Sequence, residues 1–263
     1  MTINFSSLTS FSQKIAKQAG HILKKGLQEP LLIDRKSTVT DIVTNCDKES
    51  ENFIVKSILD YYPSSGILSE EEGWIGDSHS SLKWIIDPLD GTLNFSHGYP
   101  IFCVSIAACI DEDLFCGVIY NPVSNEFFVA EKGAGAFLNN RPISISAVRD
   151  LPSSLLAVGL PYFGVLRNKD YLERFTHILF EGYPIRRSGS AALDLAYLAC
   201  GRLDGYWSDN LNPWDYAAAS IILTEAGGKI SNFQGHKPDL FTPSSILATN
   251  PFITKDLAKA LKL

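Results

Sequence analysis

Residues 83–95 read KWIIDPLDGTLNF, and this stretch predicts a buried strand that opens into a polar turn. The unbroken apolar run at residues 84–86 is typical of a strand in a hydrophobic core. Asp87 ends the run, Pro88 is expected to stop further strand pairing, and the Asp90-Gly91 pair favours a turn. The local pattern is therefore a strand, a turn and then a new element.

Two carboxylates, Asp87 and Asp90, are expected at the mouth of this strand. Thr92 follows them at a position typical of a helix N-cap. Carboxylate and carbonyl oxygens are the ligands that hard divalent cations take in proteins. The segment could equally be a well-formed turn without a ligand, and the motif alone leaves both interpretations open.

Two further acidic clusters stand at the ends of predicted elements. The short strand predicted at residues 66–69 leads into three consecutive glutamates that begin with Glu70. Asp215 lies just inside the start of an apolar helical stretch at residues 216–226, where the helix dipole also favours an acid. Three separate carboxylate clusters, each at the end of an element, together favour a metal site over three unrelated turns.

The chain resembles the inositol monophosphatase family of magnesium-dependent sugar phosphatases. The family's first signature, WIIDPxDGTxNF, is intact at residues 84–95. Its second signature, Trp-Asp followed by an Ala-rich helix and EAGG, is found at residues 214–215 and 225–228. The segments at residues 36–47 and 189–194 are also similar to the family, so the resemblance covers nearly the whole chain.

The resemblance implies a layered αβαβα sugar-phosphatase fold, of the α+β or α/β class. Within residues 101–139, apolar strands joined by turns predict an antiparallel meander, and strands alternate with helices after residue 155, which predicts a mixed α/β half. We expect an N-terminal half at residues 1–150 that carries most metal ligands. The C-terminal half, residues 151–263, would carry Asp215 and the substrate-facing loop.

Helical patterning makes further predictions for the first half. Apolar residues at helical spacing predict an opening amphipathic helix that ends at Gly26. A second helix is expected to open at Asp47, which by itself could be a cap or a first-turn acid. Residues 111–113 are also acidic, but they connect two predicted strands, and we expect them to be solvated.

The resemblance assigns the clustered acids to metal ions. A first Mg²⁺ would be held by Glu70, Asp87 and the backbone carbonyl of Leu89. A second ion would be held by Asp87, Asp90 and Asp215, at the site where the family is inhibited by Li⁺, and Glu70 would also hold a third, weaker ion. Two or three Mg²⁺ ions are therefore the expected cofactors, and a ligand set without Cys or His favours Mg²⁺ over Zn²⁺.

The resemblance also implies how water and phosphate are held. The family acid that matches Asp47 pairs with the signature threonine, here Thr92, and the pair positions a metal-bound water; Glu70 is the third expected catalytic residue. The backbone amides of Gly91 and Thr92 lie where a turn leads into a helix, which is a natural anion site for the phosphate. Lys36 is expected near the third metal or the phosphate.

The expected reaction is hydrolysis of inositol monophosphate or of a similar small polyol or sugar phosphate. Inositol-preferring members carry a carboxylate seven residues before the Trp-Asp aspartate, Asp215, which is itself an expected substrate contact. This chain has Ser208 there and Asp209 one position later, so either Asp209 substitutes after a small shift or the sugar is held differently. Ala191 resembles the family's backbone contact to the substrate ring.

Other functions remain open at this stage. Fructose 1,6-bisphosphate, histidinol phosphate and nucleotide 3'-phosphate are alternative substrates within the superfamily. A non-catalytic regulator on the same fold is a further alternative, although such a protein would have no physical use for the whole set of acids.

Composition limits which binding partners and which cellular compartment are expected. The chain has 263 residues, a formal net charge of -6 and a pI near 5.4, which argues against a nucleic-acid or anionic-membrane partner. Its five cysteines lack a CxxC pair, which favours free thiols in a reducing compartment. The first residues show no signal-peptide pattern, and no apolar run is long enough to span a membrane. We expect a cytoplasmic protein, and a homodimer by resemblance.

Overall fold

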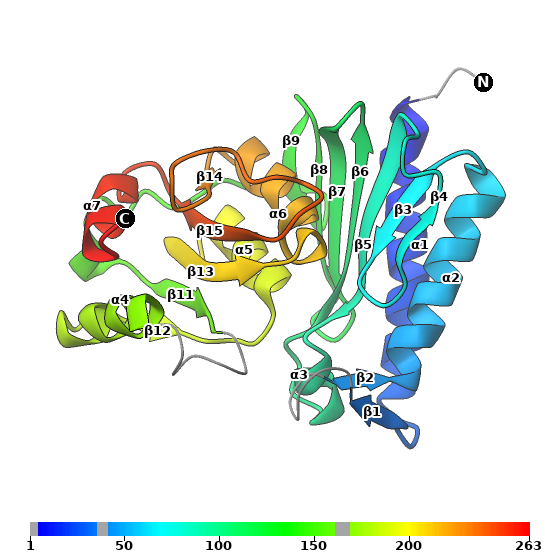
Figure 1. The fold of residues 1–263 in the computed structure, drawn as a ribbon, viewed down its shortest axis with the longest axis horizontal. Coiled ribbons are helices and arrows are strands. Elements are labelled where there is room, and N and C mark those ends of the chain that lie inside the picture. Colours follow the sequence, from blue (N-terminus) through cyan, green and yellow to red (C-terminus); the bar gives the residue numbers. More distant parts are fainter. Residues whose placement is uncertain (1–4, 36–41, 161–168) are drawn as a thin grey trace.

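The structure, a computed structural model, describes residues 5–35, 42–160 and 169–263. Two sheets alternate with three layers of helices, in the order helix, sheet, helix, sheet, helix (Figure 1). This arrangement confirms the expected layered fold. The helices are α1 (Phe5–Gly26), α2 (Asn45–Tyr61), α3 (Thr92–Ser96), α4 (Lys169–Phe180), α5 (Ala191–Ala199), α6 (Pro213–Glu225) and α7 (Thr254–Ala260).

The larger sheet contains the predicted meander. Its neighbouring strands are antiparallel except for β3 and β5, which are parallel. A separate antiparallel ribbon pairs β1 (Ile33–Arg35) with β2 (Ile42–Thr44). In spatial order the larger sheet consists of β10 (Arg141–Pro142), β9 (Gly135–Leu138), β8 (Glu126–Glu131), β7 (Asp113–Asn121), β6 (Cys103–Ile110), β5 (Leu82–Asp90), β3 (Gly66–Ser69) and β4 (Gly73–Gly76).

The smaller sheet is mixed. Strand β11 is parallel to its neighbours β12 and β13, whereas β15 is antiparallel to β13 and β14. A single turn of 3₁₀-helix, Leu151–Ser153, leads from the larger sheet into this half. In spatial order the strands are β12 (Ile185–Arg186), β11 (Leu156–Gly159), β13 (Gly205–Leu211), β15 (Ser244–Thr249) and β14 (Lys229–Ser231).

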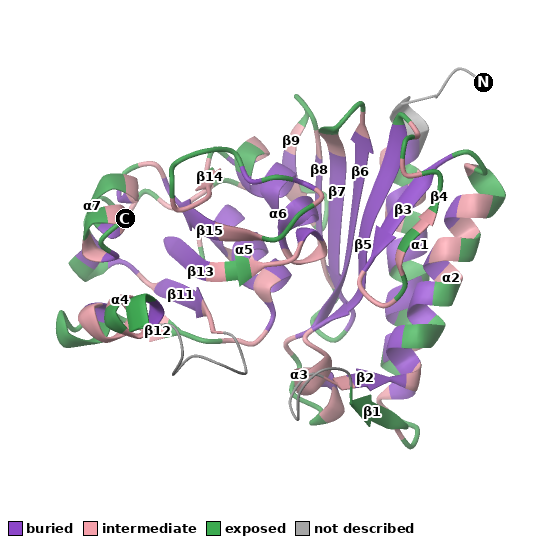
Figure 2. Ribbon diagram, in the orientation of Figure 1, coloured by how far each residue is buried: buried purple, intermediate pink, exposed green. Residues whose placement is uncertain are grey.

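Each interface between layers has its own hydrophobic core. Helices α1 and α2 cover one face of the larger sheet, where Trp84 and Ile106 are fully buried. Helices α5 and α6 fill the space between the two sheets. Helices α4 and α7 cover the outer face of the smaller sheet around Trp207. Figure 2 shows the resulting buried strands between partly exposed outer helices.

Helix α6 lies in the middle layer, and its sequence reflects this position. Residues 216–223 are all buried, as expected for a helix that is surrounded by protein. Gly117 of β7 allows the helix to come close, because a Cβ there would lie 2.5 Å from the carbonyl oxygen of Ala218. The Ser105 hydroxyl of β6 also donates to the Trp214 carbonyl at 3.3 Å. The start of α6 is therefore fixed against the larger sheet.

Two predictions about the signature turn are wrong. Pro88 does not end strand pairing, because β5 continues to Asp90 and pairs with β6 there, with only a bulge between Asp87 and Asp90. A proline lacks the backbone N–H, and a bulge is where it can be accommodated inside a sheet. Thr92 is not a helix N-cap either: Gly91, with a φ of 92°, precedes α3, and Thr92 is the first residue of that helix.

Of the other two predicted helix boundaries in the first half, one is confirmed and one is wrong. The opening helix ends at Gly26 as predicted. The second helix begins at Asn45 instead of Asp47, and Thr44 is its N-cap. The strand predicted at residues 66–69 is β3, and the three glutamates follow its C-terminal end as predicted; they form the hairpin loop into β4, a strand that the sequence did not suggest.

The acidic turn at residues 111–113 is exposed, as predicted, but it also forms ion pairs with lysines. Asp113 forms ion pairs with Lys132 at 3.4 Å and Lys237 at 3.3 Å. Hydrogen bonds from these two lysines lower the pKa of Asp113. Lys237 belongs to the loop between β14 and β15, so this surface turn links the two sheets.

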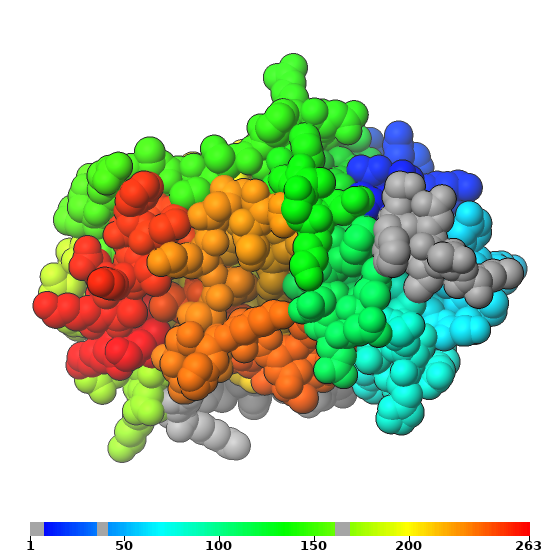
Figure 3. Space-filling model, turned by 90° about the horizontal axis from the view of Figure 1, so that it is seen from above, coloured from blue at the N-terminus to red at the C-terminus, as the bar shows by residue number. Residues whose placement is uncertain are grey.

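The expectation about the cysteines agrees with the structure. All five cysteines are free thiols, as predicted. None of the helices in the described ranges is long and apolar enough to cross a membrane. Figure 3 shows α1 and α7 at opposite ends of the molecule.

Candidate active site

Seven of the predicted site residues line one cavity of about 180 Å³, whereas Asp47, Ala191, Ser208 and Asp209 do not line it. The larger sheet contributes the end of β5 and the hairpin loop after β3, and the middle helical layer contributes the start of α6 and the turn before α5. The cavity is lined by Ile42, Glu70, Asp87, Leu89, Asp90, Gly91, Thr92, Leu93, Gly189 and Asp215. Lys36, the remaining residue expected near phosphate, lies outside the described residues.

Two carboxylates at the end of β5 are buried. Asp87 is 1% exposed and Asp90 is 8% exposed. Burial raises the pKa of Asp87 well above its usual value, and the nearby charges of Glu70, Asp90 and Asp215 raise it further. Burial raises the pKa of Asp90 to about 6, although hydrogen bonds oppose this shift. The cavity is therefore strongly electronegative once these acids ionise.

Helix α5 supplies the hydrogen bonds to Asp90. The Ser190 hydroxyl donates to Asp90 Oδ2 at 2.6 Å, and the Ala192 backbone N–H donates to the same oxygen at 2.8 Å. Ser190 is also the N-cap of α5, since its side chain accepts from the Leu193 N–H. The same hydroxyl therefore caps the helix and holds a carboxylate on the opposite sheet.

The other two cavity aspartates are each held by a nearby backbone N–H. The Leu89 N–H donates to Asp87 Oδ1 at 2.9 Å, inside the bulge of β5. The Asn212 N–H donates to Asp215 Oδ2 at 2.8 Å, just before α6 begins. Together with Asp90, all three aspartates thus have one oxygen committed to a protein donor.

Asp47 and Thr92 form the predicted pair. The Thr92 hydroxyl lies 2.9 Å from Asp47 Oδ1 and 3.0 Å from the Leu89 carbonyl oxygen, so it can donate to either. The second oxygen, Asp47 Oδ2, accepts from the backbone N–H and the hydroxyl of Thr44 at 2.7 and 2.6 Å. Burial raises the pKa of Asp47, and these hydrogen bonds lower it.

Sequence reasoning missed Thr44 and Ser190, the residues that hold Asp47 and Asp90. For Thr44 a signal was present, because Thr-x-x-Asp at residues 44–47 has the spacing of a capping box. For Ser190 no local signal exists, since its partner lies 100 positions away.

The structure does not bring Asp209 to the cavity. Its two carboxylate oxygens accept from Arg174 Nη2 at 2.8 and 2.7 Å, in an ion pair whose side chains are 12% and 14% exposed. The expectation that Asp209 replaces the family's sugar-binding carboxylate is therefore not supported by its position. Ser208 is buried between β11 and β15, and Ala191 begins α5 beside the cavity residue Gly189.

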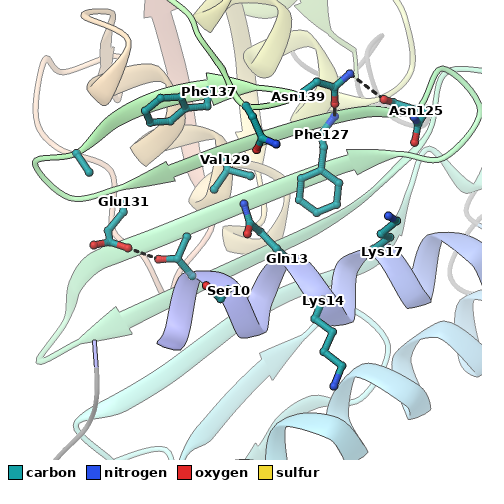
Figure 4. Close-up of a pocket in the computed structure, with 13 residues that line it drawn as sticks. Ser10, Gln13, Lys14, Lys17, Asn125, Phe127, Val129, Glu131, Phe137 and Asn139 are labelled. Carbon is teal, nitrogen blue, oxygen red and sulfur yellow. Dashed lines mark hydrogen bonds between the residues drawn. The ribbon is translucent and has the colours of Figure 1, made fainter. Parts of the chain in front are cut away.

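A larger cavity of about 790 Å³ lies elsewhere, between α1 and the strands β8 and β9 (Figure 4). Among the described residues that line it, Glu131 is the one carboxylate, and it accepts a hydrogen bond from Thr9. Phe127 and Phe137 form much of its wall. Size alone would favour this cavity, but convergent acids with raised pKa values occur only at the smaller one in the described part of the chain.

Comparison with known proteins identifies the family. A model of the inositol monophosphatase family matches residues 4–262. The chain is 44% identical over 229 residues to the inositol-1-monophosphatase of Synechocystis sp., which covers 87% of this chain and 79% of that relative. It is 40% identical over 240 residues to the Nus factor SuhB of Vibrio cholerae, which covers 90% of this chain and 89% of that relative.

Solved structures agree with this assignment. The extragenic suppressor protein suhB from Bartonella henselae superposes with a TM-score of 0.91 at 38% identity, covering 97% of this chain and 98% of that chain. The match between family model, relatives and fold extends over nearly every residue. The chain therefore belongs to the inositol monophosphatase family.

Proposed function

We propose that the protein is a Mg²⁺-dependent phosphomonoesterase that hydrolyses inositol monophosphate or a similar small polyol phosphate. The observation that carries this proposal is the single cavity that gathers Glu70, Asp87, Asp90 and Asp215. Four carboxylates around so small a space repel one another, because each negative charge disfavours the ionisation of the others. A bound cation would remove the repulsion.

The donor chemistry of the cavity fits magnesium. The candidate ligands are carboxylates and the Leu89 carbonyl, all hard oxygen donors. Among the described residues, no group of three or more His, Cys, Asp or Glu side chains is arranged to hold a metal ion as it stands. When bound, Mg²⁺ would lower the pKa of a water molecule and neutralise the phosphate oxygens.

Thr92 and Asp47 would orient the attacking water. When the Thr92 hydroxyl donates a hydrogen bond to Asp47 Oδ1, its lone pairs remain available to accept a hydrogen bond from water. Thr44 keeps Asp47 in place by filling the other carboxylate oxygen. The chain thus supplies a fixed acceptor for the water proton, while the backbone of Gly91 and Thr92 lines the cavity where the phosphate would bind.

The sugar is held without the carboxylate used by inositol-preferring relatives. Ser208 occupies that position, and Asp209 is engaged by Arg174. Ser208 is buried in the smaller sheet and does not line the cavity, so the substrate ring would lack the strong, selective hydrogen bonds that a carboxylate provides. We therefore propose broad specificity among small polyol and sugar phosphates.

A second candidate is a regulatory role, because one relative at 40% identity is named a Nus factor. Such a role could coexist with catalysis on another surface. A folded variant without turnover separates the two functions, since it would lose phosphate release and keep a regulatory role.

A phosphate-release screen tests the proposed function. The substrates are inositol monophosphate, fructose 1,6-bisphosphate, histidinol phosphate and a nucleotide 3'-phosphate, each with and without Mg²⁺. We expect Mg²⁺-dependent release, with the highest kcat/KM for inositol monophosphate. Absence of phosphate release from all four substrates with Mg²⁺ present would contradict the proposal. A higher kcat/KM for one of the other three would change the proposed substrate class.

Asp90→Asn should nearly abolish turnover but stabilise the metal-free protein at neutral pH. The folded-state pKa of Asp90, about 6, lies above the unfolded value of about 3.9. The folded wild type therefore holds an extra proton between these values and loses stability as the pH rises through them. In thermal melts with EDTA, the melting temperature of Asp90→Asn should exceed that of the wild type. The difference should be full above about pH 6 and absent below about pH 4. Asp60→Asn, at an exposed position on α2, is the control; a folded Asp90→Asn protein with wild-type kcat would refute the site.

Thr92→Ala should lower kcat far more than it raises KM, because the hydroxyl orients the attacking water. The expected loss is about 10²–10⁴-fold in kcat. Thr92→Ser keeps the hydroxyl and should retain most activity. Steady-state kinetics of both variants decide the matter, and an effect confined to KM would make Thr92 a phosphate-binding residue only.

Lithium should inhibit the enzyme uncompetitively at millimolar concentration. By analogy with the family, Li⁺ would enter the site formed by Asp87, Asp90 and Asp215 after catalysis. A monovalent ion there would leave the product phosphate less neutralised and would trap it. Rates measured over a grid of Li⁺ and substrate concentrations check this, and purely competitive inhibition would show that the second ion site differs from the family's.

A further inference from the structure

We propose that Glu51 is a positioning residue that fixes the loop carrying Glu70. The inference rests on the proposed function, in which Glu70 holds a metal ion. Glu51 lies on α2, is 3% exposed, and does not line the cavity. It would therefore act through its contacts to the loop and not by touching the ion or the substrate.

A single oxygen of Glu51 holds the loop on both sides of Glu70. Glu51 Oε1 accepts a short hydrogen bond from the hydroxyl of Ser69, the last residue of β3. The same oxygen accepts from the backbone N–H groups of Glu71 and Glu72, each at 3.3 Å. Ser69 precedes Glu70 and the other two donors follow it. The three contacts therefore fix the backbone on both sides of Glu70.

The electrostatics of this contact need an explanation, because the loop carries three consecutive negative charges. Burial raises the pKa of Glu51, and the charge of Glu72 raises it further, whereas the hydrogen bonds from Ser69, Glu72 and Glu71 lower it. A buried carboxylate next to an acidic loop is unfavourable unless hydrogen bonds compensate for it. The hydrogen bonds from Ser69, Glu71 and Glu72 provide this compensation for Glu51, and they also hold the loop against α2.

Glu51 belongs to a row of side chains on one face of α2. Asp47, Ser50 and Glu51 are spaced three and four residues apart, so they project from neighbouring positions on the helix. Asp47 accepts from Thr92, and the Ser50 hydroxyl donates to the Pro88 carbonyl at 2.9 Å. The first two turns of α2 thus hold two segments of the site, the turn at residues 88–92 and the loop at residues 69–72, at a fixed distance from each other.

Magnesium binding without substrate tests the inference. Isothermal titration calorimetry should show that Glu51→Ala weakens Mg²⁺ binding by about 10–100-fold, the usual cost of losing a group that supports a metal ligand. At saturating Mg²⁺ the kcat should stay within a few-fold of the wild type, because excess ion restores occupancy. Glu51→Gln can still accept all three hydrogen bonds and should largely rescue binding. Glu49→Ala, at an exposed position of the same helix, should leave it unchanged.

Hydrogen exchange of the metal-free protein provides a readout that does not depend on catalysis. The amides of Glu71 and Glu72 should exchange faster in Glu51→Ala than in the wild type. If the wild type releases no phosphate, the proposed function fails, yet this comparison still decides whether Glu51 anchors the loop. Should Glu51→Ala not fold, Ser69→Ala removes one donor and should shift Mg²⁺ binding and amide exchange in the same direction. Unchanged Mg²⁺ affinity together with unchanged amide exchange would overturn the proposal.

Discussion

The burial of negative charge at the end of β5 is the constraint on which the rest of the structure depends. Asp87 and Asp90 are almost fully inaccessible, and a buried carboxylate is costly unless donors or a cation compensate for it. The backbone of the β5 bulge supplies one donor, and the first residues of α5 supply two more. Helix α5 can offer them only because it lies between the two sheets. The position of the middle layer is thus tied to the charge that it helps to accommodate.

The same layer brings together residues that are distant in the sequence. The cavity takes Glu70, Asp87 and Asp90 from the larger sheet and Asp215 from α6. Residues 216–223 of α6 are buried, and Gly117 lets this helix pack directly on β7. If the acids act as proposed, small displacements would be costly for the rate, and the packing of α6 would matter as much as the acids themselves.

The sequence was sufficient where the signal is local. Apolar runs and helical spacing placed the strand at residues 84–86 and the helix that ends at Gly26, and the acids stood out at the ends of elements. The sequence was insufficient where contacts between distant residues determine the role of a side chain. Asp209 looked like a candidate sugar ligand, but an arginine 35 positions away engages it. The sequence led to no prediction for Glu51, because only the folded hairpin places donors around it.

The committed oxygens of the three cavity aspartates have a consequence for ion selectivity. Asp87, Asp90 and Asp215 each direct one carboxylate oxygen to a protein donor. Ca²⁺ takes six to eight oxygen ligands and often uses both oxygens of one carboxylate, whereas Mg²⁺ prefers six ligands and keeps several waters. To chelate Ca²⁺ with both oxygens, each aspartate would have to use the oxygen that already accepts a hydrogen bond inside the protein, where one lone pair is occupied. Under the proposed function, these hydrogen bonds would therefore favour the smaller ion, which needs only one oxygen from each aspartate.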